Sequence, residues 1–143
     1  MSMRFTLALM IVMALMTATS DLAAAALKDV TDAALDRCLA TPANASTAGQ
    51  TNCETTAARS YDQRMNTAYN ALLRRLAQPA AARLRRSQRA WLAYRDAEAQ
   101  TRQTIFATRQ GTMYVPMQSD AGVTLIGDRA KMLERYVRVL AIE

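Results

Sequence analysis

The chain has 143 residues, a formal net charge of +6 and no histidine. The absence of histidine excludes the usual serine and cysteine triads and the HExxH zinc sites, and no glycine-rich phosphate loop is present. We therefore predict a protein that is not an enzyme and that uses neither a cofactor nor a metal ion. Arginine supplies nearly all of the positive charge. Since arginine contacts carboxylates and phosphates in a planar, two-pronged manner, the composition is compatible with anionic partners.

The first 26 residues are predicted to be a signal peptide. One basic residue precedes an uncharged apolar run, Phe5–Met16, and small residues follow it. Cleavage is expected after Ser20, or after Ala25 or Ala26. The run is shorter than the roughly 20 residues that span a bilayer, which argues against a membrane anchor. The remainder, 27–143, is predicted to form a single domain of a periplasmic or secreted protein without a transmembrane segment.

The mature chain is predicted to be all-helical, since glycine and proline are scarce and apolar residues recur at steps of three and four. A first helix, 29–40, ends before Pro42, because the residue preceding a proline is pushed out of the helical region. A second helix, 51–77, begins at Thr51, whose spacing from Glu54 matches that of a capping box.

Two further helices complete a small antiparallel bundle of about four helices. Pro79 fits the start of a third helix over 80–110, and Gly111 ends that helix. Pro116 is expected to keep the following link non-helical, and the last helix covers 121–141. Short links between the helices favour antiparallel neighbours.

Two apolar stripes are predicted to form the core, because residues three or four apart lie on the same face of a helix. The second helix carries Cys53, Ala57, Tyr61, Met65, Tyr69, Leu72 and Leu76, and the last carries Val123, Ile126, Ala130, Leu133, Val137 and Leu140.

Cys38 and Cys53 are the two cysteines of the chain. An even number of cysteines in an exported chain indicates a disulfide. The bridge would close a loop of about 15 residues and stabilise the fold by roughly 3 kcal/mol. A zinc site is the rival interpretation, but it requires four nitrogen or sulfur ligands, and histidine and a third thiol are missing.

An arginine cluster surrounds the predicted turn between the second and third helices. The simpler interpretation is a solvated helix face, since most charge runs are solvated. The functional interpretation is a patch that binds an anionic cell-envelope polymer. Export argues against nucleic acid, and one nearby aromatic residue gives little support for base stacking. The candidate anion-binding residues are Arg74, Arg75, Arg83, Arg85, Arg86 and Arg89.

The stretch QRAWLAYRDAEAQ contains the single tryptophan of the chain. Trp91 is predicted to lie at the centre of the core, where its indole N–H needs a partner. Gln88 and Arg95 lie on the same side of the helix and are expected to hydrogen-bond at the edge of the buried face. Asp62 or Asp96 would neutralise Arg95, because a buried charge requires a partner.

The order of these residues resembles that of the LprI-type lysozyme-inhibitor family, over essentially the whole mature chain. The resemblance implies an exported helical protein that binds lysozyme or another cell-wall hydrolase and occludes its cleft with a loop. It rests on Cys38 and Cys53 together with two motifs, formed by Asn66, Tyr69 and Leu72 and by Gln88, Trp91, Arg95 and Asp96.

Two positions depart from the pattern of that family, in which cysteines usually stand where this chain has Ala99 and Ala121. Loss of both at once implies that they form a second disulfide in relatives. Ala99 and Ala121 are therefore expected to lie close together, with Cα atoms within about 7 Å.

Two segments are candidates for binding the partner protein. The first, 41–52, is uncharged and is held by the predicted bridge, which reduces the ordering cost of binding. The second, 111–121, offers Met113, Tyr114 and Met117 as an apolar contact surface. Either segment is alternatively a simple connector. In the first segment, the candidate contact residues are Asn44, Ser46, Thr47, Gln50, Thr51 and Asn52.

Overall fold

The computed structural model describes residues 28–142, so the predicted signal peptide and its cleavage sites lie outside the described residues. The chain divides into two compact units, of which the second, Ala34–Glu143, carries the long helices. The described residues contain no strand, which confirms the all-helical prediction. The elements are α2 (Val30–Leu39), the short 3-10 helix η1 (Pro42–Asn44), α3 (Thr47–Arg75), α4 (Gln78–Ala107) and α5 (Tyr114–Val139).

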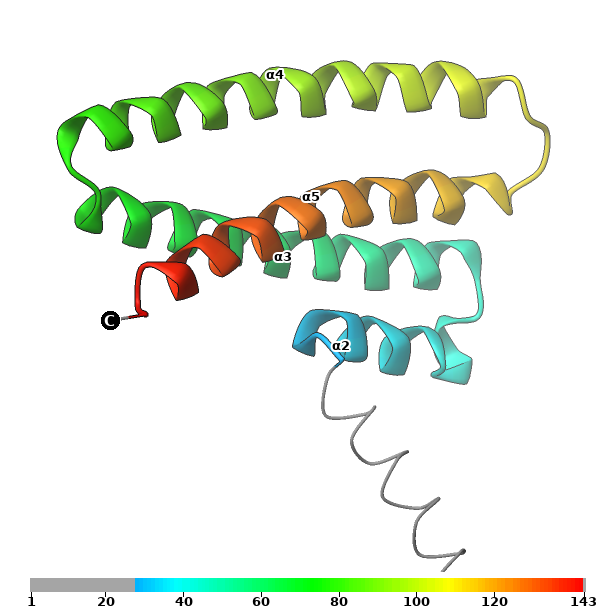
Figure 1. Ribbon diagram of the computed structural model, residues 1–143. Coiled ribbons are helices and arrows are strands. Elements are labelled where there is room, and N and C mark those ends of the chain that lie inside the picture. The colour runs from blue at the N-terminus through cyan, green and yellow to red at the C-terminus, as the bar shows by residue number, and fades with distance from the viewer. Residues whose placement is uncertain (1–27, 143) are drawn as a thin grey trace, which may run out of the picture. The chain divides into compact units, whose positions relative to one another are not determined.

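The long helices α3, α4 and α5 alternate in direction along the chain, as short links require (Figure 1). Consequently α3 and α5 run the same way, and α5 packs along α3. The helix α4 makes most of its close contacts with α5 and few with α3. The core of the second unit is therefore built chiefly between two helices that are parallel and far apart in sequence.

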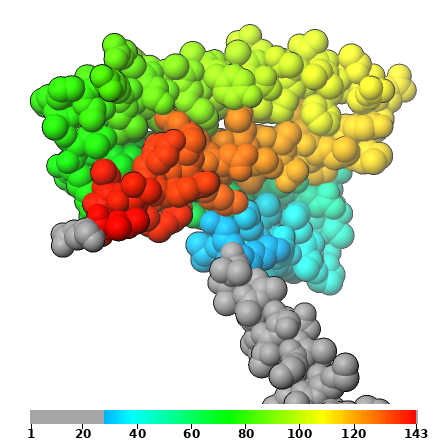
Figure 2. Space-filling view, in the orientation of Figure 1, coloured from blue at the N-terminus to red at the C-terminus, as the bar shows by residue number. Residues whose placement is uncertain are grey.

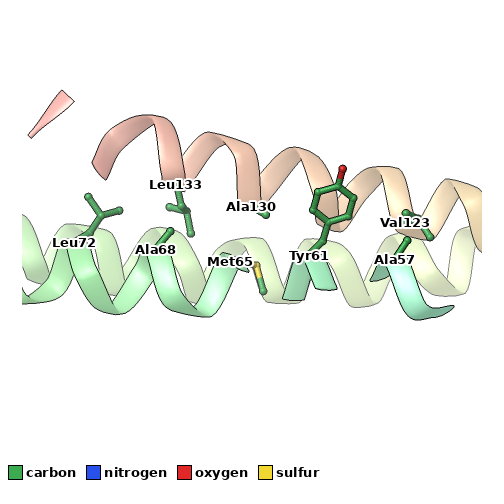
Figure 3. Packing of buried hydrophobic residues seen from close by; sticks show 8 residues of the cluster. All are labelled: Ala57, Tyr61, Met65, Ala68, Leu72, Val123, Ala130 and Leu133. Carbon is green, nitrogen blue, oxygen red and sulfur yellow. The ribbon is translucent and has the colours of Figure 1, made fainter. Parts of the chain in front are cut away.

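Both predicted apolar stripes meet at this α3–α5 interface, except that Leu140, predicted to lie in the core, follows the end of α5 and is exposed. Figure 3 shows Ala57 beside Val123, and Leu72 and Ala68 beside Leu133, so the residue numbers rise in the same direction on both helices. The buried cluster is formed by Ala57, Tyr61, Met65, Ala68, Leu72, Val123, Ala130 and Leu133, with Tyr69, Leu76, Ile126 and Val137 partly buried against it.

The α3 residue Tyr61 packs closely on Gly127 of α5. The Tyr61 side chain is 1% exposed. A Cβ atom placed on Gly127 would lie 3.0 Å from Tyr61 Cε2, so the ring packs directly on the α5 backbone. Arg64 and Lys131 stand near the same ring, with Arg64 Cζ 5.0 Å and Lys131 Nζ 5.1 Å from its centroid.

The predicted start of the second helix was wrong. The helix begins at Thr47, and Ser46 is its N-cap, where extended backbone lets the side chain accept a hydrogen bond from the Gly49 N–H at 3.1 Å. The Thr51 hydroxyl instead donates to the Thr47 carbonyl at 2.8 Å, and the Glu54 side chain is buried. A capping box at Thr51 is excluded because the helix already has a cap one turn earlier.

The predicted non-helical link around Pro116 was also wrong. The last helix begins at Tyr114, and Pro116 lies in its first turn, where it is buried. The first amide groups of a helix have no carbonyl partner within it, so a proline there removes no hydrogen bond. Pro79 occupies the corresponding place at the start of α4, as predicted.

Trp91 does not lie at the centre of the core, contrary to the prediction. It is half-buried at the edge, and the largest fully buried side chains, Tyr61, Met65, Leu72 and Leu133, belong to α3 and α5. The Arg95 guanidinium lies 5.7 Å from the Trp91 ring and donates to Asp96 from Nε and Nη2, at 2.9 and 2.7 Å. Asp96 is thus the partner of Arg95. The alternative partner, Asp62, instead accepts a hydrogen bond from Asn66 at 3.0 Å.

The buried polar group on α4 is Gln88, which joins all three long helices. Its carbonyl oxygen accepts hydrogen bonds from Arg129 Nε at 3.0 Å and Nη2 at 2.9 Å, and its amide donates to Met65 Sδ at 3.6 Å. Arg129 Nη2 also donates to the Ser87 hydroxyl at 3.3 Å. Burial lowers the pKa of Arg129, because desolvation penalises its charged form. Gln88 therefore provides the polar contact that a buried guanidinium requires.

We predict that Gln88→Leu destabilises the protein by about 1–3 kcal/mol, because Arg129 keeps its charge but loses its main acceptor. The double variant Gln88→Leu, Arg129→Met should recover part of this loss, since both polar groups are then absent. Urea unfolding measures the difference. The control Gln100→Leu, at an exposed site of the same helix, should stay within about 0.5 kcal/mol of the wild type. Equal losses in the Gln88 and Gln100 variants would contradict this role.

Candidate functional site

The described residues contain no group of three or more histidine, cysteine, aspartate or glutamate side chains placed to hold a metal ion. No helix within residues 28–142 is long and apolar enough to cross a membrane. The features that remain are surfaces: the loop closed by the two cysteines, the link between α4 and α5, and the arginine cluster.

The predicted disulfide between Cys38 and Cys53 is present, with Cα atoms 5.7 Å apart. It ties the last turn of α2 to α3 and encloses a short turn that contains η1. The Asn44 amide donates to the Cys38 carbonyl at 2.9 Å, and the Thr41 hydroxyl donates to the Arg37 carbonyl at 2.9 Å. The turn is therefore held by one covalent bond and by hydrogen bonds back to α2.

Gly49 closes the turn from the other side. A Cβ atom at this position would lie 2.6 Å from Asn44 Cα and 2.7 Å from its carbonyl oxygen, so a larger residue would collide with backbone. Glycine is required here because the first turn of α3 packs directly on the chain at Asn44. Close packing of this kind fixes the conformation of the turn before any partner arrives.

The six candidate contact residues do not share one exposed loop. Thr47, Gln50, Thr51 and Asn52 lie on α3, and the Gln50 amide donates to the Ala45 carbonyl at 3.3 Å. The half-buried Asn44 points back to Cys38. Of the six, Ser46 and Asn52 are exposed. Thr41, Pro42, Ala43 and Ala45 are also exposed on the turn; they belong to the candidate segment 41–52 but not to the six candidate contact residues.

The link between α4 and α5 lies at the same end of the second unit as this turn (Figure 1). A surface hollow of about 350 Å³ lies between the helices at this end, lined by Thr51 of α3, Ala99 and Arg102 of α4, and Val115, Gln118, Ser119 and Gly122 of α5. Met113, Val115 and Met117 are exposed beside it. We call this combined surface the loop end, defined as residues 40–52 and 108–122.

Glu54 is the buried charge nearest the loop end. It is 4% exposed, and its Oε2 atom has no hydrogen-bond partner among the described residues. Burial raises the pKa of the Glu54 carboxyl, a hydrogen bond with Ser119 partly lowers it, and the charge of Asp120 raises it further. Glu54 is therefore held in surroundings that favour its protonated form.

The arginine cluster lies at the opposite end of the unit. Arg74, Arg75, Arg83, Arg85, Arg86 and Arg89 are all exposed. Figure 2 shows the C-terminal part of α5 against the region of the α3–α4 turn, and this part adds Arg135 and Arg138. We call this surface the arginine end, defined as residues 68–89 and 131–142. The predicted arginine site is thus an exposed basic surface, separated from the loop end by the length of α3.

These observations define a small all-helical, disulfide-bonded protein whose candidate sites are surfaces. The chain belongs to the family described as lysozyme inhibitor LprI, whose model matches residues 38–133. It is also similar, at 32% identity and a TM-score of 0.75, to a crystal structure of an uncharacterised protein from Burkholderia thailandensis. That match covers 80% of this chain and 57% of the other, so this chain spans little more than half of that protein. No curated protein matches the chain.

We predict that the double variant Ala99→Cys, Ala121→Cys forms a second disulfide. Ala99 lines the same hollow as Gly122, the residue after Ala121, which brings α4 and α5 together at this point. Mass spectrometry of the oxidised protein after thiol alkylation measures the bridge. The control Ala93→Cys, Ala121→Cys should keep two free thiols, and free thiols in both variants would contradict the predicted proximity.

We also predict that Glu54→Gln stabilises the protein at neutral pH but not in acid. The pKa of Glu54 in the folded state is raised above its ordinary value of 4.5. The folded wild type therefore loses stability as the pH rises above 4.5 toward the raised pKa, whereas glutamine does not titrate. Unfolding free energies of both proteins, measured across this range, should converge below pH 4.5 and diverge above it. A difference that is independent of pH would rule out this explanation.

Proposed function

We propose that the protein is an exported inhibitor of lysozyme or of a related cell-wall hydrolase, and that its loop end occludes the cleft of the enzyme. Membership of the family described as lysozyme inhibitor LprI supports the class of target. The predicted signal peptide and the disulfide support export, because disulfides persist in oxidising compartments. The role requires binding alone, without chemistry on a substrate.

The observation that carries the proposal is the rigidity of the turn at residues 40–46. A bond between Cys38 and Cys53, a hydrogen bond from Asn44 and close packing at Gly49 hold it in one conformation. A loop that is already ordered loses little conformational entropy when it enters a cleft. Its projecting residues are small, and no charged residue stands between Arg37 and Glu54, so no charge on the turn must be desolvated.

The positive charge of the protein does not oppose this mode of binding. The c-type lysozymes are basic, and a uniformly basic inhibitor would be repelled by them. The arginine end is separated from the loop end by α3, whose 29 residues span about 40 Å. Charges interact weakly beyond about 8 Å at physiological salt, so the arginine cluster exerts little repulsion at the loop end.

The proposal is tested by titrating the purified protein against lysozyme activity. We expect stoichiometric inhibition by the wild type, and inhibition weakened at least about tenfold, or 1.4 kcal/mol, by Ala43→Arg, which places a bulky cation on the projecting turn. Ala82→Arg makes the same change at an exposed site of the arginine end and should inhibit like the wild type.

Two results would contradict the proposal. If the wild type inhibits neither lysozyme nor other cell-wall hydrolases, the assigned function fails. If Ala43→Arg and Ala82→Arg inhibit equally well, the contact does not involve the turn, and inhibition uses another surface. Reduction of the disulfide in the wild type gives a second measure, since release of the turn should weaken inhibition while circular dichroism still reports helices.

A further inference from the structure

The arginine end contains an apolar hollow that the proposed inhibition does not use. Its volume is about 270 Å³, and side chains from all three long helices line it. The lining residues are Leu72, Leu76, Leu84, Tyr136, Val139 and Leu140. The hollow lies where the C-terminal part of α5 meets the ends of α3 and α4 that flank their turn.

Apolar side chains are also exposed around the hollow. Val139 is 58% exposed and Ile142 is 79% exposed, with Tyr136 and Leu140 at 47% and 43%. Four large apolar side chains of one helix terminus thus lie together in contact with water. Contiguous apolar surface of this kind marks an interaction site more often than scattered apolar residues do.

Cations flank this apolar surface on every helix that contributes to it. Arg75 is the last residue of α3 and precedes Leu76, Arg83 precedes Leu84 on α4, and Arg138 precedes Val139 on α5. Residues one apart on a helix are turned by about 100°, so Arg83 and Arg138 each stand to one side of an apolar lining residue, and Arg75 is exposed next to Leu76 at the end of α3. The surface therefore combines an apolar centre with a basic rim.

Negative charge is nearly absent from the same region. Within residues 68–89 and 131–142, Glu134 is the one acidic residue. Its carboxylate forms a two-pronged salt bridge with Arg64, with Nη2 2.7 Å from Oε2 and Nε 2.7 Å from Oε1. The rim arginines are therefore not neutralised by acids of their own region, and they favour a partner that is itself anionic.

We propose that the arginine end docks on an anionic lipid bilayer. A bilayer surface offers phosphate groups to the arginines and an apolar boundary layer, about 5–10 Å deep, to Val139, Leu140 and Ile142. Tyr136 has the amphipathic ring typical of residues at that boundary. A second copy of this chain fits less well, because a symmetric contact would place the same arginines against one another. Docked in this way, the protein keeps the loop end about 40 Å from the membrane, free to bind another protein.

Sedimentation with vesicles tests the proposal, using phosphatidylcholine alone and phosphatidylcholine mixed with phosphatidylglycerol. We expect the wild type to bind the mixed vesicles, more weakly at high salt, and not the neutral ones. Arg135→Gln with Arg138→Gln should weaken binding about 30-fold, since each basic residue near an anionic surface contributes a factor of about five. The matched control, Arg37→Gln with Arg109→Gln, removes the same charge at exposed sites outside the arginine end and should weaken binding far less.

A third variant, Val139→Ser with Ile142→Ser, separates lipid insertion from simple anion binding. It should lose most of the binding that survives high salt, while retaining its helices by circular dichroism. All proteins must share the N-terminus of the wild type, verified by mass, so that residues 1–27 contribute equally.

Four outcomes would overturn the proposal. The first is failure of the wild type to bind mixed vesicles, and the second is an equal loss of vesicle binding in the two double arginine variants. The third is unchanged vesicle binding by Val139→Ser with Ile142→Ser, which would show anion recognition alone. The fourth is concentration-dependent dimerisation, by light scattering, that the serine variant abolishes, since the surface would then bind a second copy. None of these outcomes depends on inhibition of lysozyme, so the two proposals fail independently.

Discussion

The contact between Tyr61 and the bare backbone at Gly127 is the constraint on which the second unit depends. The buried Tyr61 ring on α3 needs room against α5, and Gly127 provides it because a Cβ atom there would lie only 3.0 Å from the ring. The short links make α3 and α5 run in the same direction, and this contact lets the two helices pack closely side by side. Gln88 then joins α4 to α5 by accepting hydrogen bonds from the buried guanidinium of Arg129.

Parallel packing of two long helices also gives the unit two chemically different ends. The N-terminal ends of α3 and α5 meet beside the disulfide and form an ordered surface with few charges. Their C-terminal ends meet beside the α3–α4 turn and gather arginines around apolar side chains. The two ends are about 40 Å apart, several times the distance of about 8 Å over which salt screens charges. The charges at one end therefore have little effect on a partner that binds at the other end. One chain can thus present a rigid, neutral surface and a basic, partly apolar one without conflict.

Sequence reasoning succeeded where a single physical rule dominated and failed where two rules competed. The stripes through Tyr61 and Leu133 were predicted because burial imposes helical periodicity on apolar residues. The start of α3 was misplaced because Ser46 and Thr51 are both acceptable caps, and packing of Gly49 on Asn44 selects the earlier one. Pro116 was read as a helix breaker although it stands in a first turn, where proline is tolerated. Both errors extended the predicted loops and shortened the helices.

The sequence by itself determined the helical class, the disulfide and the faces that become buried, because these depend on local spacing and on residue type. The family was recognisable from the two cysteines and the two motifs, and of the motif residues Leu72 and Gln88 are buried whereas Asn66 and Asp96 are exposed. Only the tertiary structure decided that Trp91 lies at the edge, that Gln88 is the partner of Arg129, and that Val139 and Leu84 line one apolar hollow. Those relations join residues tens of positions apart, and periodicity within one helix carries no information about which other helix its face will meet.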